Sequence, residues 1–152
     1  NSPFDRYLKG DENAISENAK KGYRLFLKLG CQTCHTGPAM GGQSFEYADL
    51  KGDFFSGRAK TNDDNGLMNF TKKETDKHRF RVPTLRNVEL TWPYMHDASA
   101  QTLEEAITKM YHYQLGYDKL DKNEVRLLVA FLKTLTGEYQ GKPVQGEVCP
   151  AP

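Results

Sequence analysis

The stretch Gly30-Cys31-Gln32-Thr33-Cys34-His35 decides the fold of this chain. Its Cys-x-x-Cys-His spacing is typical of covalent haem attachment, because residues three and four apart on a helical turn lie side by side. The two thiols can bond the two vinyl groups of one macrocycle while the imidazole turns toward the iron. The motif therefore predicts one c-type haem, bonded to Cys31 and Cys34, with His35 as an axial ligand.

Two other hypotheses use the same cysteines, a zinc site and a redox-active dithiol. A structural zinc needs four ligands, usually from a second Cys or His pair, and the remaining cysteine, Cys149, lies far downstream. A thioredoxin-type dithiol would follow a strand, whereas Cys31 follows a helical pattern. Haem fits the spacing best, and we interpret Cys149 as a thiol of the tail.

Length and composition favour a single domain that contains a bound group. A chain of 152 residues can bury a core of its own, and a hydrophobic fraction of 38% suits an interior partly filled by a macrocycle. The 21 basic and 20 acidic residues nearly cancel, so no global field attracts nucleic acid or a membrane surface. The longest apolar run, 127–132, is too short to span a bilayer.

The haem motif also predicts where the protein works. Covalent haem attachment takes place outside the bacterial cytoplasm, and no signal peptide is visible at Asn1. We therefore expect a processed protein of the periplasm.

The chain divides into three parts. Residues 1–15 are polar and contain Pro3 and Gly10, which indicates an arm or interdomain linker. Residues 16–137 form the expected haem domain, and residues 138–152 form a Gly- and Pro-rich tail. Within the domain, Ser16 is a predicted N-cap and Gly30 a predicted stop for one helix. The apolar face of that helix is Ala19, Tyr23, Phe26 and Leu27.

A long irregular stretch follows the haem motif. Residues 37–80 contain six glycines and no sustained period, which is far longer than an ordinary connection, so we expect this loop to wrap the haem. The pair Gly41-Gly42 indicates either a close backbone approach or a simple turn. Residues 81–95 are interrupted by Pro83 and Pro93 and predict extended segments with a short turn.

Two further helices are expected near the C-terminus. Thr102 with Glu105, and Asp121 with Glu124, have the spacing of capping boxes. The face of the first helix is Leu103, Ala106, Ile107 and Met110, and that of the second is Val125, Leu128, Val129, Leu132 and Leu135, with a stop at Gly137. The pattern predicts an all-α cytochrome c fold in which the terminal helices cross.

Four methionines are candidates for the sixth iron ligand. A thioether opposite a histidine raises the reduction potential because it favours ferrous iron. Met40 follows His35 too closely to reach the opposite face, and Met68 lies in the loop without a register. Met95, in the proline-framed segment, and Met110, on an inward helix face, remain equal candidates on these grounds.

Other polar and aromatic residues have weaker claims. His96 is interpreted as a hydrogen-bonded structural histidine that could also bind iron, and His78 as a solvated surface residue. Arg81 and Arg86 could bind the haem propionates, because a guanidinium fork suits a carboxylate, or could be ordinary surface residues. Trp92 is interpreted as core or interface.

These motifs together closely resemble the C-terminal haem domain of the bacterial dihaem cytochrome c peroxidases. The matching stretches are residues 1–10, Gly30-Cys-x-x-Cys-His, Gly41-Gly-Gln, Pro83-Thr-Leu-Arg-Asn, Leu90-Thr-x-Pro-Tyr-x-His-Asp, Thr102-Leu-Glu-Glu and Leu128-Val-Ala-Phe-Leu-Lys. The resemblance implies the high-potential haem, with Met110, shortly before Gln114-Leu115-Gly116, as its distal ligand. Tyr94 is the alternative ligand. A calcium ion bound by the backbone carbonyls of Thr91 and Pro93 is also implied.

The resemblance further implies a division of labour. A small cytochrome c or blue copper donor would reduce this haem, which would pass electrons to a peroxidatic haem in a preceding domain, where hydrogen peroxide becomes water. A homodimer is among the assemblies it allows. That preceding domain is absent from this chain, Gly66-Leu67 replaces the usual Gly-Arg, and Ala98 replaces a usual glycine. The alternatives are a stand-alone monohaem electron carrier and a haem sensor.

Overall fold

The computed structural model describes residues 1–146 of the chain. The α-helices are α1 (Pro3–Leu8), α2 (Glu17–Lys28), α3 (Met68–Thr71), α4 (Leu103–Tyr113) and α5 (Lys122–Lys133). Single 3-10 turns span Cys31–Thr33, Asn62–Asn65, Glu74–Asp76 and Val88–Leu90. The strands β1 (Phe45–Tyr47) and β2 (Arg79–Arg81) pair antiparallel, as do β3 (Glu138–Tyr139) and β4 (Lys142–Pro143). The mostly helical architecture confirms the predicted fold class.

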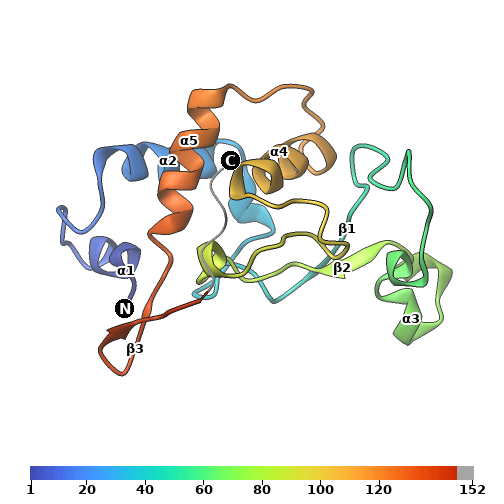
Figure 1. Cartoon of the computed structure of the whole chain (residues 1–152), viewed down its shortest axis with the longest axis horizontal. Helices are drawn as coiled ribbons and strands as arrows, with labels where there is room; N and C mark the ends of the chain where they lie inside the picture. Colours follow the sequence, from blue (N-terminus) through green and yellow to red (C-terminus); the bar gives the residue numbers. More distant parts are fainter. Residues whose placement is uncertain (147–152) are drawn as a thin grey trace.

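Helices α2 and α5 lie side by side and pack against each other (Figure 1). They approach so closely that a Cβ atom built on Gly22 would lie 1.9 Å from the carbonyl oxygen of Leu127 and 2.9 Å from the Cβ of Phe131. The ring of Phe26 lies 5.2 Å from that of Phe131 beside this contact. The predicted α5 face is buried as expected, at Val125, Leu128, Val129, Leu132 and Leu135. The terminal helices therefore pack together as the sequence predicts.

The helix N-termini agree with the sequence analysis only in part. The Ser16 hydroxyl accepts from the Ala19 amide, which confirms the cap of α2. Thr102 caps α4 in the same way, but the Glu105 carboxylate accepts from the Gln101 amide, so the reciprocal box is not formed. The box predicted at Asp121 is wrong, because its side chain makes no capping hydrogen bond. Helix α5 is stabilised instead by the burial of its apolar face.

The first fifteen residues contain a helix that the sequence analysis did not anticipate. Ser2 and Asp5 form a capping box for α1. The Phe4 side chain is buried, with its ring edge-on to that of Phe131 at 5.1 Å. The Phe4 amide donates to the Thr134 carbonyl at 3.1 Å, just beyond α5. This segment therefore packs on the same core as the terminal helices.

The long loop folds into a separate lobe. Strands β1 and β2 pair at its base, and α3 lies at the end that projects away from the helices (Figure 1). Gly66 is essential to this path, because a Cβ there would lie 2.3 Å from the Arg79 carbonyl oxygen and φ is +57°. Short helices and strands, rather than one long helix or strand, thus order the loop.

The last described residues form the β3–β4 hairpin, which lies within the predicted tail. The interpretation of Cys149 as a tail thiol concerns a residue outside the described range.

The contact at Gly22 yields a stability prediction. Replacement by alanine normally favours a helix by about 1 kcal/mol. Here Gly22→Ala should lower the free energy of unfolding by about 1–3 kcal/mol, because the methyl group collides with the α5 backbone. Denaturant unfolding measures this change. Lys21→Ala, on the exposed face of α2, is the control and should change it by less than about 0.5 kcal/mol. A more stable Gly22→Ala protein would contradict the close crossing.

Candidate haem-binding site

The haem motif follows α2 directly. Gly30 has φ +81°, a left-handed conformation that ends the helix and starts the 3-10 turn at Cys31. The backbone N–H of His35 donates to the Cys31 carbonyl at 3.1 Å, which closes the turn around both cysteines. Neither Cys31 nor Cys34 is disulfide-bonded. The turn thus presents two free thiols and one imidazole from six consecutive residues.

The environment of the thiols does not suit a metal thiolate. Burial raises the pKa of the Cys31 thiol to about 11, so this sulfur is protonated at neutral pH. Burial also raises the pKa of Cys34, and the nearby Glu46 carboxylate adds to the effect. No group of three or more Cys, His, Asp or Glu side chains gathers anywhere in residues 1–146. A four-ligand zinc site therefore lacks its donors here, whereas thioether bonds need only the two thiols.

His35 lies beside two backbone carbonyls. Its Nδ1 is 3.3 Å from the carbonyl oxygen of Met40, and the carbonyls of Met40 and Pro83 both act to raise the pKa of the ring. Burial lowers the pKa of His35 despite both carbonyls, which favours neutral imidazole. Because the Met40 carbonyl is an acceptor, the tautomer with the proton on Nδ1 fits this site, and it leaves the lone pair of Nε2 for a metal.

The glycine at position 41 brings these carbonyls together. A Cβ on Gly41 would lie 2.1 Å from the Pro83 carbonyl oxygen, and φ there is +132°. The Gly42 amide donates to the Val82 carbonyl at 2.7 Å, and the Leu85 amide to the Met40 carbonyl at 3.1 Å. The Gly41-Gly42 pair therefore makes a close backbone approach, one of the two roles left open by the sequence.

Met110 does not lie in the core among residues 1–146. Leu103, on the same predicted face of α4, is buried at 3% exposure, whereas Met110 is 38% exposed. The expectation that Met110 points inward is therefore wrong within the described chain, and its thioether is open to a group outside it. Met95 is half-buried against the core with φ +67°. Met40 is buried in the core, and Met68 lies in α3.

The Tyr94 hydroxyl points into the protein. It donates to the Val88 carbonyl at 3.0 Å, and the side chain is buried. This hydrogen bond disfavours Tyr94 as an iron ligand.

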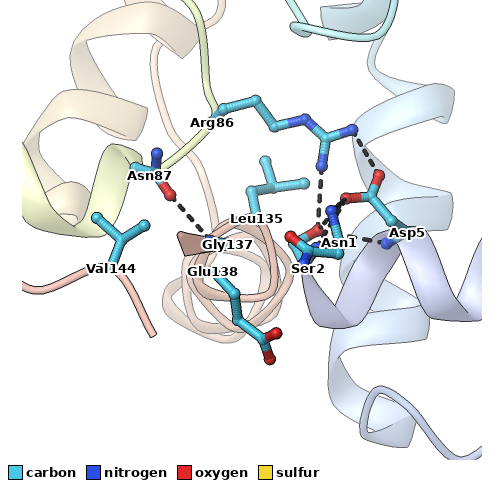
Figure 2. Close-up of a pocket in the computed structure, with 9 residues that line it drawn as sticks. All are labelled: Asn1, Ser2, Asp5, Arg86, Asn87, Leu135, Gly137, Glu138 and Val144. Carbon is cyan, nitrogen blue, oxygen red and sulfur yellow. Dashed lines mark hydrogen bonds and ion pairs between the residues drawn. The ribbon is translucent and has the colours of Figure 1, made fainter. Parts of the chain in front are cut away.

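Arg86 joins three separate segments instead of standing free (Figure 2). Its Nε donates to the Pro38 carbonyl at 2.8 Å, Nη1 to the Ser2 hydroxyl at 3.0 Å, and Nη2 to Asp5 at 2.8 Å. It thereby ties the N-terminal helix to the loop after His35. These contacts involve all three guanidinium nitrogens, so Arg86 is a structural clamp between these segments. Arg81 is exposed, and its Nε donates to the Gly42 carbonyl at 3.0 Å.

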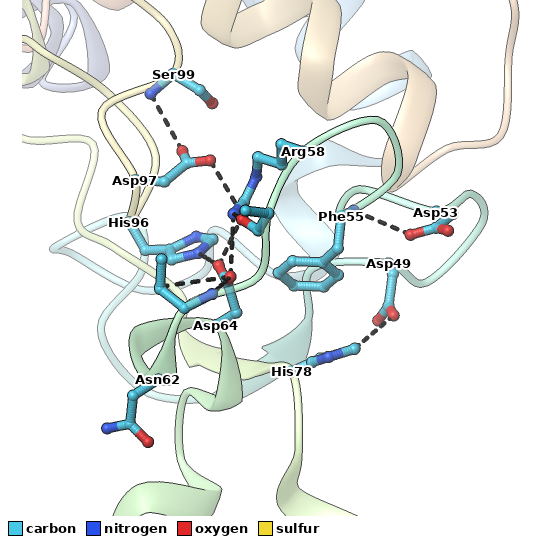
Figure 3. A network of polar contacts seen from close by, with 12 residues as sticks. Asp49, Asp53, Phe55, Arg58, Asn62, Asp64, His78, His96, Asp97 and Ser99 are labelled. Atoms are coloured by element: carbon cyan, nitrogen blue, oxygen red, sulfur yellow. Dashed lines mark hydrogen bonds and ion pairs between the residues drawn. The ribbon is translucent and has the colours of Figure 1, made fainter.

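A buried carboxylate, Asp64, organises the long loop (Figure 3). It is 1% exposed and accepts two hydrogen bonds from the Arg58 guanidinium, at 2.6 and 3.0 Å. The Thr61 amide donates to it at 2.6 Å, and Nε2 of His96 lies 2.7 Å away. The Arg58 guanidinium holds the pKa of this carboxyl far below its usual range, with help from His96 and Thr61. Arg58 also pairs with Asp97 at 3.3 Å.

The Asp64 network was missed by the sequence analysis. Thr61 and Asp64 have capping-box spacing, which could have indicated that the Asp64 side chain turns back on its own loop. Its partner His96 confirms the interpretation of a hydrogen-bonded structural histidine.

The expectation for His78, the histidine of the long loop, is wrong. His78, interpreted as solvated surface, is only 16% exposed in its side chain. Its Nδ1 lies 2.7 Å from Asp49, and its ring lies 4.0 Å from that of Phe55. The expectation is wrong because Phe55, buried from the loop, provides an apolar surface beneath the imidazole.

The long loop also supports the helix that carries Met110. The Lys51 amide donates to the Tyr113 carbonyl at 2.9 Å, and the Gln114 side-chain amide donates to the carbonyls of Tyr47 and Ala48. The ring of Phe54 lies 5.0 Å from that of Tyr113. One stretch of chain therefore runs from the His35 side to the far end of α4, as a loop that wraps a bound group must.

Two further observations bear on the predicted ligands and surroundings. Thr91 and Pro93, the predicted calcium ligands, are exposed. The indole nitrogen of Trp92 is buried without a hydrogen-bond partner among residues 1–146.

No helix in residues 1–146 has the length and apolar character needed to cross a membrane.

Comparison with known proteins shows the family of this chain and how much of each relative's length it matches. The cytochrome c family model matches residues 19–136. The chain is 47% identical over 137 residues to a cytochrome c551 peroxidase of Nitrosomonas europaea, covering 90% of this chain and 40% of that protein. It is 50% identical over 138 residues to the cytochrome c peroxidase Ccp of Escherichia coli, covering 91% and 29%.

Two further proteins match most of this chain. A cytochrome c551 peroxidase of Pseudomonas aeruginosa is 39% identical over 157 residues, covering 99% of this chain and 44% of the relative. The crystal structure of a MauG-like protein associated with microbial copper homeostasis aligns with a TM-score of 0.73 and 31% identity, over 91% of this chain and 52% of that one. The chain thus spans less than half the length of these three peroxidases.

The Asp64 network yields a prediction of acid sensitivity. Since the pKa of Asp64 is lowered in the folded protein, its stabilisation is present above the usual carboxyl value near 3.9 and is lost as the pH falls below it. At neutral pH, Asp64→Asn should lower the free energy of unfolding by about 2 kcal/mol, because Arg58 loses its charged partner. As the pH falls below about 4, the two proteins should converge.

Urea unfolding between pH 7 and pH 3 measures that convergence. Asp63→Asn is the matched control, since Asp63 is the exposed neighbour and its substitution should leave both the stability and the pH dependence unchanged. Equal unfolding free energies for Asp64→Asn and wild type at neutral pH would contradict the role of the network.

Proposed function

Because the chain belongs to the cytochrome c family, we propose that it is the electron-transferring haem domain of a larger cytochrome c peroxidase. The observation that carries the proposal is one turn that presents the free thiols of Cys31 and Cys34 together with the imidazole of His35, whose Nδ1 lies beside the Met40 carbonyl. The similarity to peroxidases more than twice its length supports the enzyme class.

Each site residue has a separate task. When bound, haem c supplies reversible one-electron chemistry at its iron. Cys31 and Cys34 hold it covalently, each thiol adding its S–H across one vinyl double bond. His35 would bind the iron through Nε2, while the Met40 carbonyl at Nδ1 keeps the ring in place. Met110 would be the second ligand, and its soft sulfur would favour the reduced state.

The proposed relay has two partners. A small cytochrome c or blue copper protein donates electrons, and a peroxidatic haem domain of the parent protein receives them. There, one hydrogen peroxide takes up two electrons and two protons and yields two water molecules. We place the protein in the periplasm, with one haem in this chain, calcium at the carbonyls of Thr91 and Pro93, and a homodimer as its assembly.

A stand-alone monohaem electron carrier is the second candidate. It is favoured by the packing of residues 1–146, which bury one hydrophobic core cluster of their own. The full gene separates the two candidates: an upstream second haem motif supports the peroxidase, and an upstream signal peptide alone supports the carrier.

The distal ligand is tested by absorption spectroscopy of the haem-loaded chain. Met110→Leu should abolish the long-wavelength methionine-to-iron band of the ferric protein, because leucine fills similar space without a sulfur. Met95→Leu is the matched control and should keep the band. The opposite pattern, a band that survives in Met110→Leu and disappears in Met95→Leu, would reverse the assignment.

The division of labour is tested by kinetics. The isolated chain should be reduced reversibly by a donor cytochrome yet reduce little hydrogen peroxide, since both axial positions of its iron are occupied. The full-length protein is the positive control for peroxide turnover. Rapid turnover by this chain alone would refute an electron-transfer role separate from the peroxidatic haem.

A further inference from the structure

The contacts of Arg86 connect the N-terminal helix with the loop that follows His35. Its Nη1 and Nη2 donate to Ser2 and Asp5, at the start of α1, at 3.0 and 2.8 Å (Figure 2). Its Nε donates to the Pro38 carbonyl at 2.8 Å. The Ser2 acceptor is 1% exposed, and hydrogen bonds from a guanidinium are among the stronger ones in proteins. Arg86 therefore holds this loop against α1.

Three consecutive carbonyls of the loop accept from three consecutive residues of the segment that runs beside it. The carbonyls of Pro38, Ala39 and Met40 accept, in that order, from the Arg86 side chain, the Thr84 hydroxyl and the Leu85 amide. The last of these carbonyls is also the one that lies 3.3 Å from Nδ1 of His35. The donor of Arg86 thus belongs to the set that places the acceptor of the imidazole.

Packing fixes only one end of this loop. The Met40 side chain is buried, whereas residues 36–39 are exposed. An open cavity of about 470 Å³ lies beside them, and its walls include His35, Pro38 and Arg86. Within residues 1–146, the loop therefore lacks closely packed side chains on that side, and its position there depends on hydrogen bonds.

We propose that Arg86 is a positioning residue for His35, which keeps the Met40 carbonyl at Nδ1 and so helps to set the reduction potential of the domain. The proposal rests on the proposed function, since it requires that His35 binds iron. A hydrogen bond from Nδ1 to a carbonyl makes the imidazole a stronger electron donor through Nε2, which favours the ferric state. Because α1 supplies the other partners of the guanidinium, a movement of the N-terminal segment reaches His35 through Arg86.

Removal of the guanidinium has two effects of opposite sign. A nearby positive charge favours ferrous iron, so the loss of that charge alone lowers the reduction potential. Loss of the hydrogen bond to Pro38 loosens the carbonyl at Nδ1, weakens the imidazole as an electron donor and raises the potential. The sign of the change therefore distinguishes positioning from charge.

The first experiment measures the reduction potential of the haem-loaded chain. In Arg86→Met, which keeps the unbranched stem without its donors, the potential should rise. Arg86→Lys keeps the charge, but one ammonium cannot serve Pro38 and α1 together, so here too the potential should rise. Lys28→Met, the control, removes an exposed cation at the end of α2 and should not raise it. A lower potential in Arg86→Met, or the wild-type value in Arg86→Lys, would overturn the proposal.

The second experiment follows the loop itself by NMR of the ferrous haem-loaded chain. In Arg86→Met, the Leu85 amide, which donates to the Met40 carbonyl, should exchange with solvent about tenfold faster. The Nδ1–H signal of His35 should move upfield as its hydrogen bond lengthens. Lys28→Met should match wild type in both. Unchanged signals in Arg86→Met would mean that burial of Met40 is sufficient to place the carbonyl, which contradicts the proposal.

A double-mutant cycle tests the connection to α1. Asp5→Asn weakens the partner of Arg86 and leaves the loop itself unaltered. If it acts through the guanidinium, it should raise the potential of the wild-type chain but not that of Arg86→Met. Equal changes in both backgrounds would mean that Asp5 acts only through its charge, and would refute the connection between α1 and His35.

The outcomes separate this proposal from the proposed function. If the mass of the wild-type chain shows no covalently bound haem, the proposed function fails, and the exchange of the Leu85 amide still tests whether Arg86 holds the loop. If haem is bound and Arg86→Met matches wild type in potential and in both NMR signals, the assignment of Arg86 alone fails. Should Arg86→Met not fold, Arg86→Lys and Asp5→Asn decide the question.

Discussion

The contact between the backbone of α5 and Gly22 of α2 is the constraint on which the rest of the structure depends. It allows the two terminal helices to approach until the Leu127 carbonyl lies where any larger side chain would stand. The close packing buries Phe131, against which Phe26 of α2 and Phe4 of α1 both pack. Since Cys31 follows α2 by only a few residues, fixing α2 on α5 also fixes the start of the haem motif.

Two polar devices then hold the irregular chain around that motif. On the His35 side, the glycine at position 41 lets the Pro83 carbonyl come close enough to share the imidazole with Met40. On the α4 side, Asp64 ties the loop to His96, just before the helix of Met110. Both devices use backbone carbonyls and buried side chains, in place of regular secondary structure, to hold the irregular chain.

The sequence predicted what local patterns determine and missed what distant contacts determine. The core face of α5, the buried residues Ala19 and Phe26 of α2, and the cap at Ser16 follow from spacing alone, so they were predictable. Leu27, predicted on the same α2 face, is wrong, because it is 38% exposed. The helix α1 was hidden in a short polar segment, and its stability comes from Phe4 burial and from Arg86, eighty-four residues beyond Ser2.

In the site, too, local patterns were predictable and distant contacts were not. His35 and its cysteines are contained in six residues, whereas the Pro83 carbonyl that orients His35 has no side-chain signature at all. His78 was interpreted from its charged neighbours, and Phe55, twenty-three residues earlier in the chain, determines its actual environment. Arg86 matched a propionate partner by residue type, but its type suits Asp5 equally well.

The use of Arg86 as a structural clamp has a consequence for how the domain sets its redox properties. A guanidinium beside a propionate would cancel the carboxylate charge and would itself raise the reduction potential. Because Arg86 is bound to Asp5, Ser2 and Pro38, a potential raised by charge cancellation would need another cation. The proposed ligand Met110 would favour the reduced state without one, since a soft thioether sulfur stabilises ferrous iron.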